Sequence, residues 1–300
     1  MREELFKNCT LCPRKCNVNR LEGKRGYCGM DGTIRAARAA LHMWEEPCIS
    51  GKKGSGAVFF SGCGLRCCFC QNREIAIGDS GKEISVERLA EIFLELQEKG
   101  AANLNLVTGA HYVPHIISAL ELARGKGMNL PVVYNSSGYE SVETIRRLDG
   151  YVDVYLPDMK YMEPELAAAF SNARDYPQAA QSAIAEMMRQ TGPCQFAENG
   201  YIKRGTIVRH LILPGHTKNS IAVLKYLYRT YGEDIFISVM NQYTPVWKNE
   251  KFPELNRKVT RREYEKVLDA AIELGIENGY FQEGETAEES FIPAFDYEGV

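Results

Sequence analysis

The sequence predicts an α/β fold in which a parallel sheet is covered by helices. From residue 57 onward, apolar segments of strand length alternate with segments of helical period. Repeated β-then-α units of this kind fold as parallel sheets. The 300 residues suit one barrel-sized domain with a small appendage. We therefore expect the main domain over residues 57–282, a cysteine-rich segment and connector over residues 1–56, and a tail over residues 283–300.

The expected strands are short apolar runs that end in turn residues. They cover residues 57–61, 104–107, 131–134, 152–156, 206–213 and 235–240, with a final short strand at residues 280–281. The expected helices cover residues 86–99, 114–124, 142–148, 220–231 and 261–274, with two more inside residues 163–188. Ser85 has the side chain of a helix N-cap, and Asn199-Gly200 predicts a hairpin around residues 196–202. The pattern assigns the connector at residues 33–43 to neither strand nor helix.

Composition excludes several classes of function. A net charge of −3 with 25% charged residues gives no sign of a nucleic-acid-binding surface. No apolar run approaches the roughly 20 residues of a membrane helix, and the start of the chain has no apolar signal core. We therefore expect a cytoplasmic protein. In that reducing compartment the ten cysteines are expected to be metal ligands rather than disulfides.

A cysteine loop follows the first expected strand. Cys63, Cys67 and Cys70 have the spacing C-x3-C-x2-C, and the aromatic Phe69 precedes the last thiol. Three thiolates can hold three corners of a cubic iron–sulfur cluster, where a ferredoxin-type site supplies four. The fourth iron is then open to a small-molecule ligand, which is a catalytic arrangement. Cys68 does not fit the spacing and is expected to pack.

A second group of cysteines precedes the barrel. Cys9, Cys12, Cys16 and Cys28 have the spacing C-x2-C-x3-C-x11-C. Four thiols within twenty residues can close a tetrahedral zinc site or hold an auxiliary cluster, because thiolates suit both metals. The two alternatives stay open at this point.

Polar side chains follow the expected strands where the strands end. Besides the cysteine loop they are Thr108, Asn135 with Ser136, Asp158 with Lys160, His216, and Gln242 with Tyr243. The carboxyl ends of parallel strands meet at one edge of the sheet, where reactive groups gather. A single polar strand end would be explained as a solvated turn. Five polar strand ends in register around a cysteine loop predict a functional site.

Over about residues 57–280 the chain resembles the radical S-adenosylmethionine superfamily, and within it the pyruvate formate-lyase activating enzyme group and its uncharacterised homologues. The cysteine spacing is the most specific part of the resemblance. It implies a partial (β/α)6 barrel with one [4Fe-4S] cluster on Cys63, Cys67 and Cys70. S-adenosylmethionine would chelate the open iron and be cleaved reductively to a 5′-deoxyadenosyl radical, which abstracts a hydrogen atom from substrate. The protein would supply binding, orientation and exclusion of water.

The resemblance also implies roles for single residues. Phe69 matches the aromatic position that packs against adenine. Asn135 and Ser136 lie where the activating enzymes carry an Asp-Thr-Asn-Gly segment beside the ribose and methionine. Asp158-Met159-Lys160 matches their Asp-Leu-Lys, which reaches the methionyl carboxylate, and Lys160 is the expected catalytic residue.

Three further positions complete the comparison with that family. The family's Gly-Gly-Glu is here Gly109-Ala110-His111, so cofactor contacts are expected from the backbone of Thr108 and Gly109. Tyr243 falls near a family histidine and is also expected to bind cofactor. Residues 209–215 match the family's fifth-strand Arg-x-Val-Val-Val-Pro-Gly. Asn135 replaces the family's Asp and removes a charge, which counts against a bound cation and strict glycyl-radical function.

Two classes of function remain as hypotheses. The first is an anaerobic radical oxidoreductase that acts on a protein or peptide substrate, in the manner of a glycyl-radical-enzyme activase or of a peptide-modifying or methylating enzyme. The resemblance implies a low-potential electron donor of the flavodoxin or ferredoxin type. The second is a non-catalytic metal-binding or electron-carrying protein, but an electron carrier has no need of an open iron.

Overall fold

A mostly parallel sheet forms the centre of the molecule, as predicted. The computed structural model describes residues 4–78, 80–282 and 293–300. The strand order is β10-β9-β8-β6-β5-β4-β2-β1-β3, and β7 pairs with β8 beside this path. The strands are β1 Ile34–His42, β2 Ser55–Phe60, β3 Lys82–Ile84, β4 Leu104–Val107, β5 Val132–Ser136, β6 Val154–Pro157, β7 Gln195–Phe196, β8 Ile202–Leu211, β9 Phe236–Met240 and β10 Gly279–Phe281. From β2 to β10 every neighbouring pair on the path is parallel.

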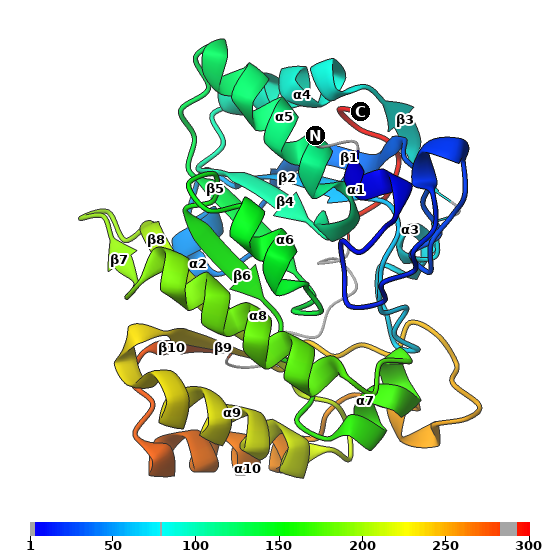
Figure 1. The fold of residues 1–300 in the computed structure, drawn as a ribbon. Coiled ribbons are helices and arrows are strands. Elements are labelled where there is room, and N and C mark those ends of the chain that lie inside the picture. The colour runs from blue at the N-terminus through cyan, green and yellow to red at the C-terminus, as the bar shows by residue number, and fades with distance from the viewer. Residues whose placement is uncertain (1–3, 79, 283–292) are drawn as a thin grey trace.

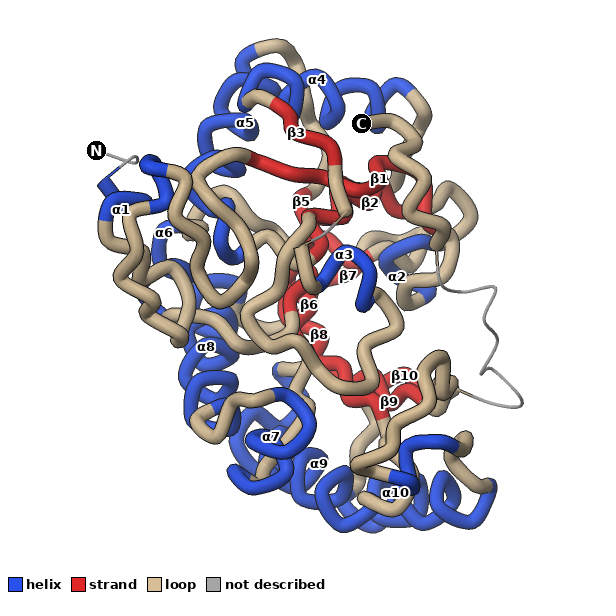
Figure 2. The backbone as a smooth tube through the Cα atoms, turned by 90° about the vertical axis from the view of Figure 1, so that its right-hand side faces the viewer, coloured by secondary structure: helices blue, strands red, loops and turns tan. Residues whose placement is uncertain are grey.

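The long helices cover one face of this sheet. They are α4 Val86–Glu98, α5 Val113–Gly125, α6 Val142–Arg147, α7 Pro164–Ser171, α8 Tyr176–Thr191, α9 Thr217–Tyr231 and α10 Arg261–Leu274. Figure 1 shows them in front of and around the strands. In Figure 2 the strands trace an arc, and the short helices α2 Pro47–Ser50 and α3 Arg73–Ala76 lie on the side of the arc away from the long helices. The α/β fold class is therefore confirmed.

Alternation along the strands separates the two faces of the sheet. On β2, Val58 and Phe60 belong to the core beneath α4 and α5, whereas Ala57 and Phe59 belong to a small cluster on the opposite face. This is the period of two that a strand imposes on its side chains. The opposite face also carries the polar residues described below, so the sheet is apolar toward the helices and partly polar toward the inside of the arc.

The structure extends the sheet before the expected start of the barrel. The unassigned connector forms β1, which pairs antiparallel with β2, and β3 pairs with the other edge of β1. The alternation in β1 is masked in the sequence because four of its nine residues are alanines, which do not distinguish inward from outward positions. The sheet therefore crosses the expected boundary at residue 57, and the division of the chain into domains stays a prediction.

The hairpin and the fifth expected strand turn out to be continuous. β7 and β8 pair across the Asn199-Gly200 turn, with Gln195 opposite Arg204 and Phe196 opposite Ile202. β8 then runs on to Leu211, so this strand begins four residues earlier than the expected start at residue 206. Gly205, with a φ of +144°, lies where a side chain would meet Cys194, and it accommodates the change of partner from β7 to β6 and β9.

The described end of the chain packs on β1. Ala39 donates its backbone N–H to the carbonyl of Glu298 at 2.8 Å, and Tyr297 donates to that of Ala37 at 3.1 Å. Residues 283–292 of the expected tail lie outside the described residues. None of the helices in the described part of the chain is long and apolar enough to cross a membrane.

Candidate active site

A cavity of about 340 Å³ opens where the parallel strands end. Its lining includes the cysteine loop after β2, Thr108 after β4, Ser136 at the end of β5, Asp158 after β6 and Met240 at the end of β9. These side chains come from segments far apart in the sequence, and they meet because the strands between them are parallel. The predicted gathering of strand-end residues is therefore present.

The cysteine loop is held in place by its backbone. Gly62 has a φ of +89°, and a side chain there would approach Met30 to 2.5 Å and the carbonyl of Cys28 to 2.8 Å. Only glycine fits such a turn. Farther along, Cys70 donates its N–H to the carbonyl of Cys67 at 3.2 Å, and Cys68 donates to that of Phe170 at 2.8 Å. The loop is thus tied both to itself and to the end of α7.

Cys63, Cys67 and Cys70 all line the cavity, which is the arrangement that a three-thiolate cluster site needs. Burial raises the pKa of Cys67 to about 11 and that of Cys70 to about 12. Thiols with such pKa values stay protonated at neutral pH, so a metal must displace their protons when it binds. The hydroxyl of Ser171 donates to the sulfur of Cys67 at 2.9 Å.

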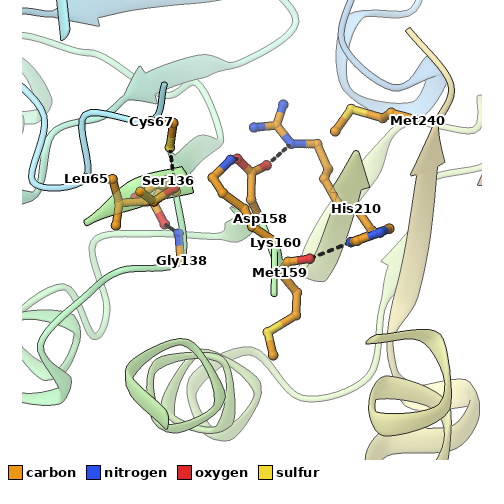
Figure 3. A network of polar contacts seen from close by, with 12 residues as sticks. Leu65, Cys67, Ser136, Gly138, Asp158, Met159, Lys160, His210 and Met240 are labelled. Carbon is orange, nitrogen blue, oxygen red and sulfur yellow. Dashed lines mark hydrogen bonds and ion pairs between the residues drawn. The ribbon is translucent and has the colours of Figure 1, made fainter. Parts of the chain in front are cut away.

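A chain of buried charges crosses the cavity beside this loop. The ammonium of Lys160 lies 2.5 Å from one carboxylate oxygen of Asp158 (Figure 3). The other oxygen accepts from Nε of Arg209 at 3.0 Å. Arg209 also donates to the side-chain carbonyl of Asn135 at 2.6 Å and to the carboxylate of Glu45 at 3.1 Å. Two cations and two carboxylates thereby neutralise one another in a largely enclosed space.

Neighbouring charges decide the protonation states here. Burial alone would raise the pKa of Asp158, but Lys160 and Arg209 outweigh it and hold that pKa below its usual value. Burial would likewise lower the pKa of Lys160, yet the adjacent Asp158 carboxylate raises it. The pair is therefore ionised at neutral pH, with the ammonium available to a second anion.

Sequence reasoning missed Glu45 and Glu46. Both line the cavity, and Glu45 also accepts from the amide of Asn105 at 3.0 Å. Burial raises the pKa of Glu46, and its Oε2 has no hydrogen-bond partner among the described residues. No local pattern marks these glutamates, because the pairing of β1 with β2 brings them into the barrel.

Most of the expected cofactor-binding residues share this cavity. Phe69, Thr108, Asn135, Ser136, Asp158 and Lys160 line it together with the three cysteines. Thr108 has a φ of +60°, which is rare for a β-branched residue and is a form of backbone strain that clusters at functional sites. Its N–H donates to the carbonyl of Asn135 at 2.9 Å.

Two expected cofactor-binding residues lie outside the lining. A side chain at Gly109 would approach Ile116 to 2.6 Å, so this glycine allows the close approach of α5. Tyr243 donates its hydroxyl to the carbonyl of Leu255 at 2.7 Å, and its ring stands edge-on to Phe69 with 6.2 Å between centroids. In the structure Tyr243 supports Phe69 from behind.

The strand-end histidines have structural partners. His111 is buried and contacts the carbonyl of Ser61 at 2.7 Å through Nε2, which braces the start of the cysteine loop. His216 pairs with Glu254 at 3.5 Å and packs edge-on against Phe170. Neither residue lines the cavity.

Sequence comparison places this geometry in a family. The Radical SAM superfamily matches residues 57–227, which include the cysteine loop and the strand ends around the cavity. The chain belongs to the radical SAM superfamily. Membership implies S-adenosylmethionine and a [4Fe-4S] cluster as the cofactors and supports radical chemistry, which makes the protein an enzyme.

Two curated proteins are similar to this chain in sequence. The uncharacterized protein MJ0674 of Methanocaldococcus jannaschii is 30% identical over 276 residues, which cover 90% of this chain and 75% of that protein. The pyruvate formate-lyase-activating enzyme of Clostridium pasteurianum is 26% identical over 113 residues, which cover 36% of this chain and 46% of that enzyme. The resemblance to the activating enzymes is thus present but partial.

Among solved structures, Streptococcus suis SuiB is similar with a TM-score of 0.46 and 13% identity. The match covers 77% of this chain and 48% of SuiB, so the chain spans about half the length of that protein.

Across residues 4–78, 80–282 and 293–300, no three Cys, His, Asp or Glu side chains form a ligand set for a single metal ion. The three cavity cysteines fit the superfamily's cluster through their spacing and their common exposure to one cavity.

Proposed function

We propose that this radical SAM protein abstracts a hydrogen atom from a protein or peptide substrate, in the manner of a glycyl-radical-enzyme activase. The observation that carries the proposal is the position of the three cysteines. Within the described residues they are the only thiols on a cavity that is also lined by the Asp158–Lys160 pair. A three-thiol site leaves one corner of a cluster open, and an ammonium nearby suits the carboxylate of a bound amino acid.

Each group has a specific task in this proposal. Cys63, Cys67 and Cys70 would hold the cluster. When bound, the cluster and S-adenosylmethionine supply a one-electron cleavage that yields the 5′-deoxyadenosyl radical. Lys160 would bind the methionyl carboxylate, and Asp158 would fix the position of its ammonium.

The remaining lining residues would orient the nucleoside. Phe69 offers a ring for the adenine, and Tyr243 keeps that ring in place. Asn135 and Ser136 would offer polar groups to the ribose. The backbone of Thr108 would lie beside the methionyl amino group of S-adenosylmethionine. Gly109 allows α5 to pack closely behind Thr108. A site enclosed by these side chains excludes water from a reactive radical.

The substrate class rests on the relatives. The similarity to the activating enzyme of Clostridium pasteurianum supports a protein substrate. A peptide-modifying or methylating enzyme is the nearest alternative within the superfamily. Either reaction needs an electron, for which we propose a flavodoxin or ferredoxin of an anaerobic cytoplasm.

The test is S-adenosylmethionine cleavage by protein that is purified anaerobically, reconstituted with iron and sulfide, and reduced. We expect 5′-deoxyadenosine from the wild type and none from C63A/C67A/C70A. If the wild type, with a full cluster, forms no 5′-deoxyadenosine, the enzyme proposal fails and a non-catalytic metal protein becomes the better account. Labelled hydrogen transferred from a candidate glycyl-radical enzyme into 5′-deoxyadenosine would then identify an activase.

A further inference from the structure

The N-terminal cysteine segment has only a small apolar core of its own, apart from Cys28 and Met30, which join the main core. Its own core consists of three buried residues, Phe6, Cys9 and Leu11. Backbone hydrogen bonds close its loop, since Cys9 donates to the carbonyl of Val18 at 3.1 Å and Asn17 donates to that of Cys9 at 3.0 Å. So small a core does not fix a loop by itself, and small domains of this kind usually rely on metals or disulfides.

Two of its sulfurs converge over a glycine. A Cβ at Gly26 would lie 3.4 Å from the sulfur of Cys16 and 3.8 Å from that of Cys28. These are ordinary van der Waals distances, so they show that the two sulfurs face the same point beside Gly26. The N–H of Tyr27 donates to the Cys16 sulfur at 3.2 Å, as backbone amides do to metal-bound thiolates.

A buried cation accompanies the other thiols. Arg20 is 1% exposed, and its guanidinium lies 4.0 Å from the sulfur of Cys9. It donates to the carbonyls of Asp31 and His111, both at 2.5 Å. A centre with four thiolates carries net negative charge, which a fixed guanidinium offsets.

The segment is docked on the active-site loop through Arg14, which lies between Cys12 and Cys16 in the sequence. Its Nε donates to the carbonyl of Gly64 in the active-site loop at 2.8 Å. Its two other nitrogens donate to the carbonyls of Asn172 at 2.5 Å and Ser171 at 3.2 Å. The Cys12 sulfur lies 3.7 Å from where a Gly64 side chain would start. In Figure 1 the dark blue N-terminal loop accordingly runs beside the cyan segment that leads to α3.

We propose that Cys9, Cys12, Cys16 and Cys28, which do not form a closed ligand set in the described structure, close around a second thiolate-bound metal centre, a zinc ion or an iron–sulfur cluster. In this proposal the centre clamps the active-site loop through Arg14. A metal that joins Cys12 to Cys16 fixes the turn that carries Arg14. The guanidinium then holds the cysteine loop and the end of α7 together through three carbonyls. This role is structural and goes beyond the proposed reaction.

The first experiment tests whether the N-terminal cysteines bind a metal and identifies it. In C63S/C67S/C70S the active-site cluster has no ligands, so any thiolate-bound metal belongs to the N-terminal centre. After anaerobic purification and reconstitution we expect about one zinc ion or about four iron atoms with sulfide per chain, lost when C12S/C16S is added. The metal and sulfide analysis distinguishes the two forms.

A control is needed in case C63S/C67S/C70S does not fold. For this purpose C12S/C16S is also made in the wild-type background, where it should lower the metal content per chain by the same amount of zinc or iron. Wild type and C12S/C16S with equal metal contents would overturn the proposal, whatever the outcome of the 5′-deoxyadenosine assay.

The second experiment tests whether Arg14 stabilises the active-site loop. Arg14→Ala should keep the N-terminal metal but lose active-site iron to a chelator several-fold faster. Arg14→Lys should not restore the wild-type rate, because an ammonium cannot serve three carbonyls in a fixed fork. Lys15→Ala, an exposed neighbour in the same loop, is the control. Equal loss rates for wild type and Arg14→Ala would refute the clamp while leaving the proposed reaction untouched.

Discussion

The guanidinium of Arg209 lies 3.1 Å from the carboxylate of Glu45, a residue 164 positions earlier in the chain. The pair joins β8 to the segment between β1 and α2 across the inside of the arc. Both side chains are mostly buried, with 15% and 7% of their surfaces exposed. Glu45 also accepts from two asparagine amides, so its carboxylate anchors one wall of the cavity.

We expect Glu45→Ala to destabilise the protein by about 3 kcal/mol, because it leaves Arg209 short of a partner in a buried site. Urea unfolding of the metal-free protein measures this loss. Arg261→Ala, which breaks an exposed helix pair with Glu265, is the matched control and should cost no more than about 0.5 kcal/mol. Equal losses from the two variants would show that the Glu45 pair is as weak as a surface one.

The origin of Glu45 shows how far the sequence could predict this site. Asn135, Asp158 and Lys160 were predictable because they follow parallel strands, whose ends must meet. Glu45 and Glu46 follow β1, whose alanine-rich pattern does not mark a strand, and only the long-range pairing with β2 carries them into the cavity. The local pattern contains no information about that pairing.

Gly109 and Tyr243 are next to lining residues in the sequence but lie outside the lining itself. The family resemblance suggests both as cofactor contacts, and Tyr243 also follows an expected strand. In the structure Gly109 meets α5 and Tyr243 reaches Leu255. A strand end predicts the neighbourhood of a side chain, but the direction of each side chain depends on turns such as the left-handed one at Thr108.

Lys160→Met should weaken S-adenosylmethionine binding by about tenfold or more, because it removes a charge-assisted hydrogen bond to the carboxylate. Equilibrium binding to the reconstituted protein measures the affinity, and iron analysis should give the same content as in the wild type. Lys218→Met, an exposed lysine on α9, should leave the affinity unchanged. Wild-type affinity in Lys160→Met would remove Lys160 from the cofactor site.

Ser171→Ala should make the cluster harder to reduce. The Ser171 hydroxyl donates to the Cys67 sulfur, and hydrogen bonds to ligand sulfurs stabilise the reduced cluster. Loss of about 1 kcal/mol corresponds to a midpoint potential about 40 mV more negative for one electron. Spectroscopic redox titration measures this shift.

Tyr161→Phe separates this hydrogen bond from a general effect of packing. The Tyr161 hydroxyl contacts Ser171 at 2.7 Å but is not bonded to Cys67. We therefore expect a smaller shift from Tyr161→Phe than from Ser171→Ala. Equal midpoint potentials in the wild type and Ser171→Ala would mean that the hydrogen bond does not tune the cluster.

His210 should make the protein sensitive to acid. It is 1% exposed, and it contacts the carbonyl of Met159 at 2.7 Å through Nδ1 (Figure 3). Burial lowers its pKa to about 4 from the model-compound value of 6.5. Between those two pH values the unfolded chain takes up a proton that the folded protein does not. Stability is therefore complete above pH 6.5 and falls toward pH 4, by up to about 1.4 kcal/mol per pH unit.

His210→Asn should flatten this dependence, because an amide stays neutral throughout the range and can still donate to the Met159 carbonyl. The measurement is the free energy of unfolding of the metal-free protein in urea at three pH values from 7 down to 4.5. His111, whose pKa burial lowers to about 3, is present in both proteins, so its contribution cancels in the comparison. We expect the wild type to lose about 2 kcal/mol more than the variant over this range. Parallel losses in the two proteins would show that His210 titrates normally in the folded state.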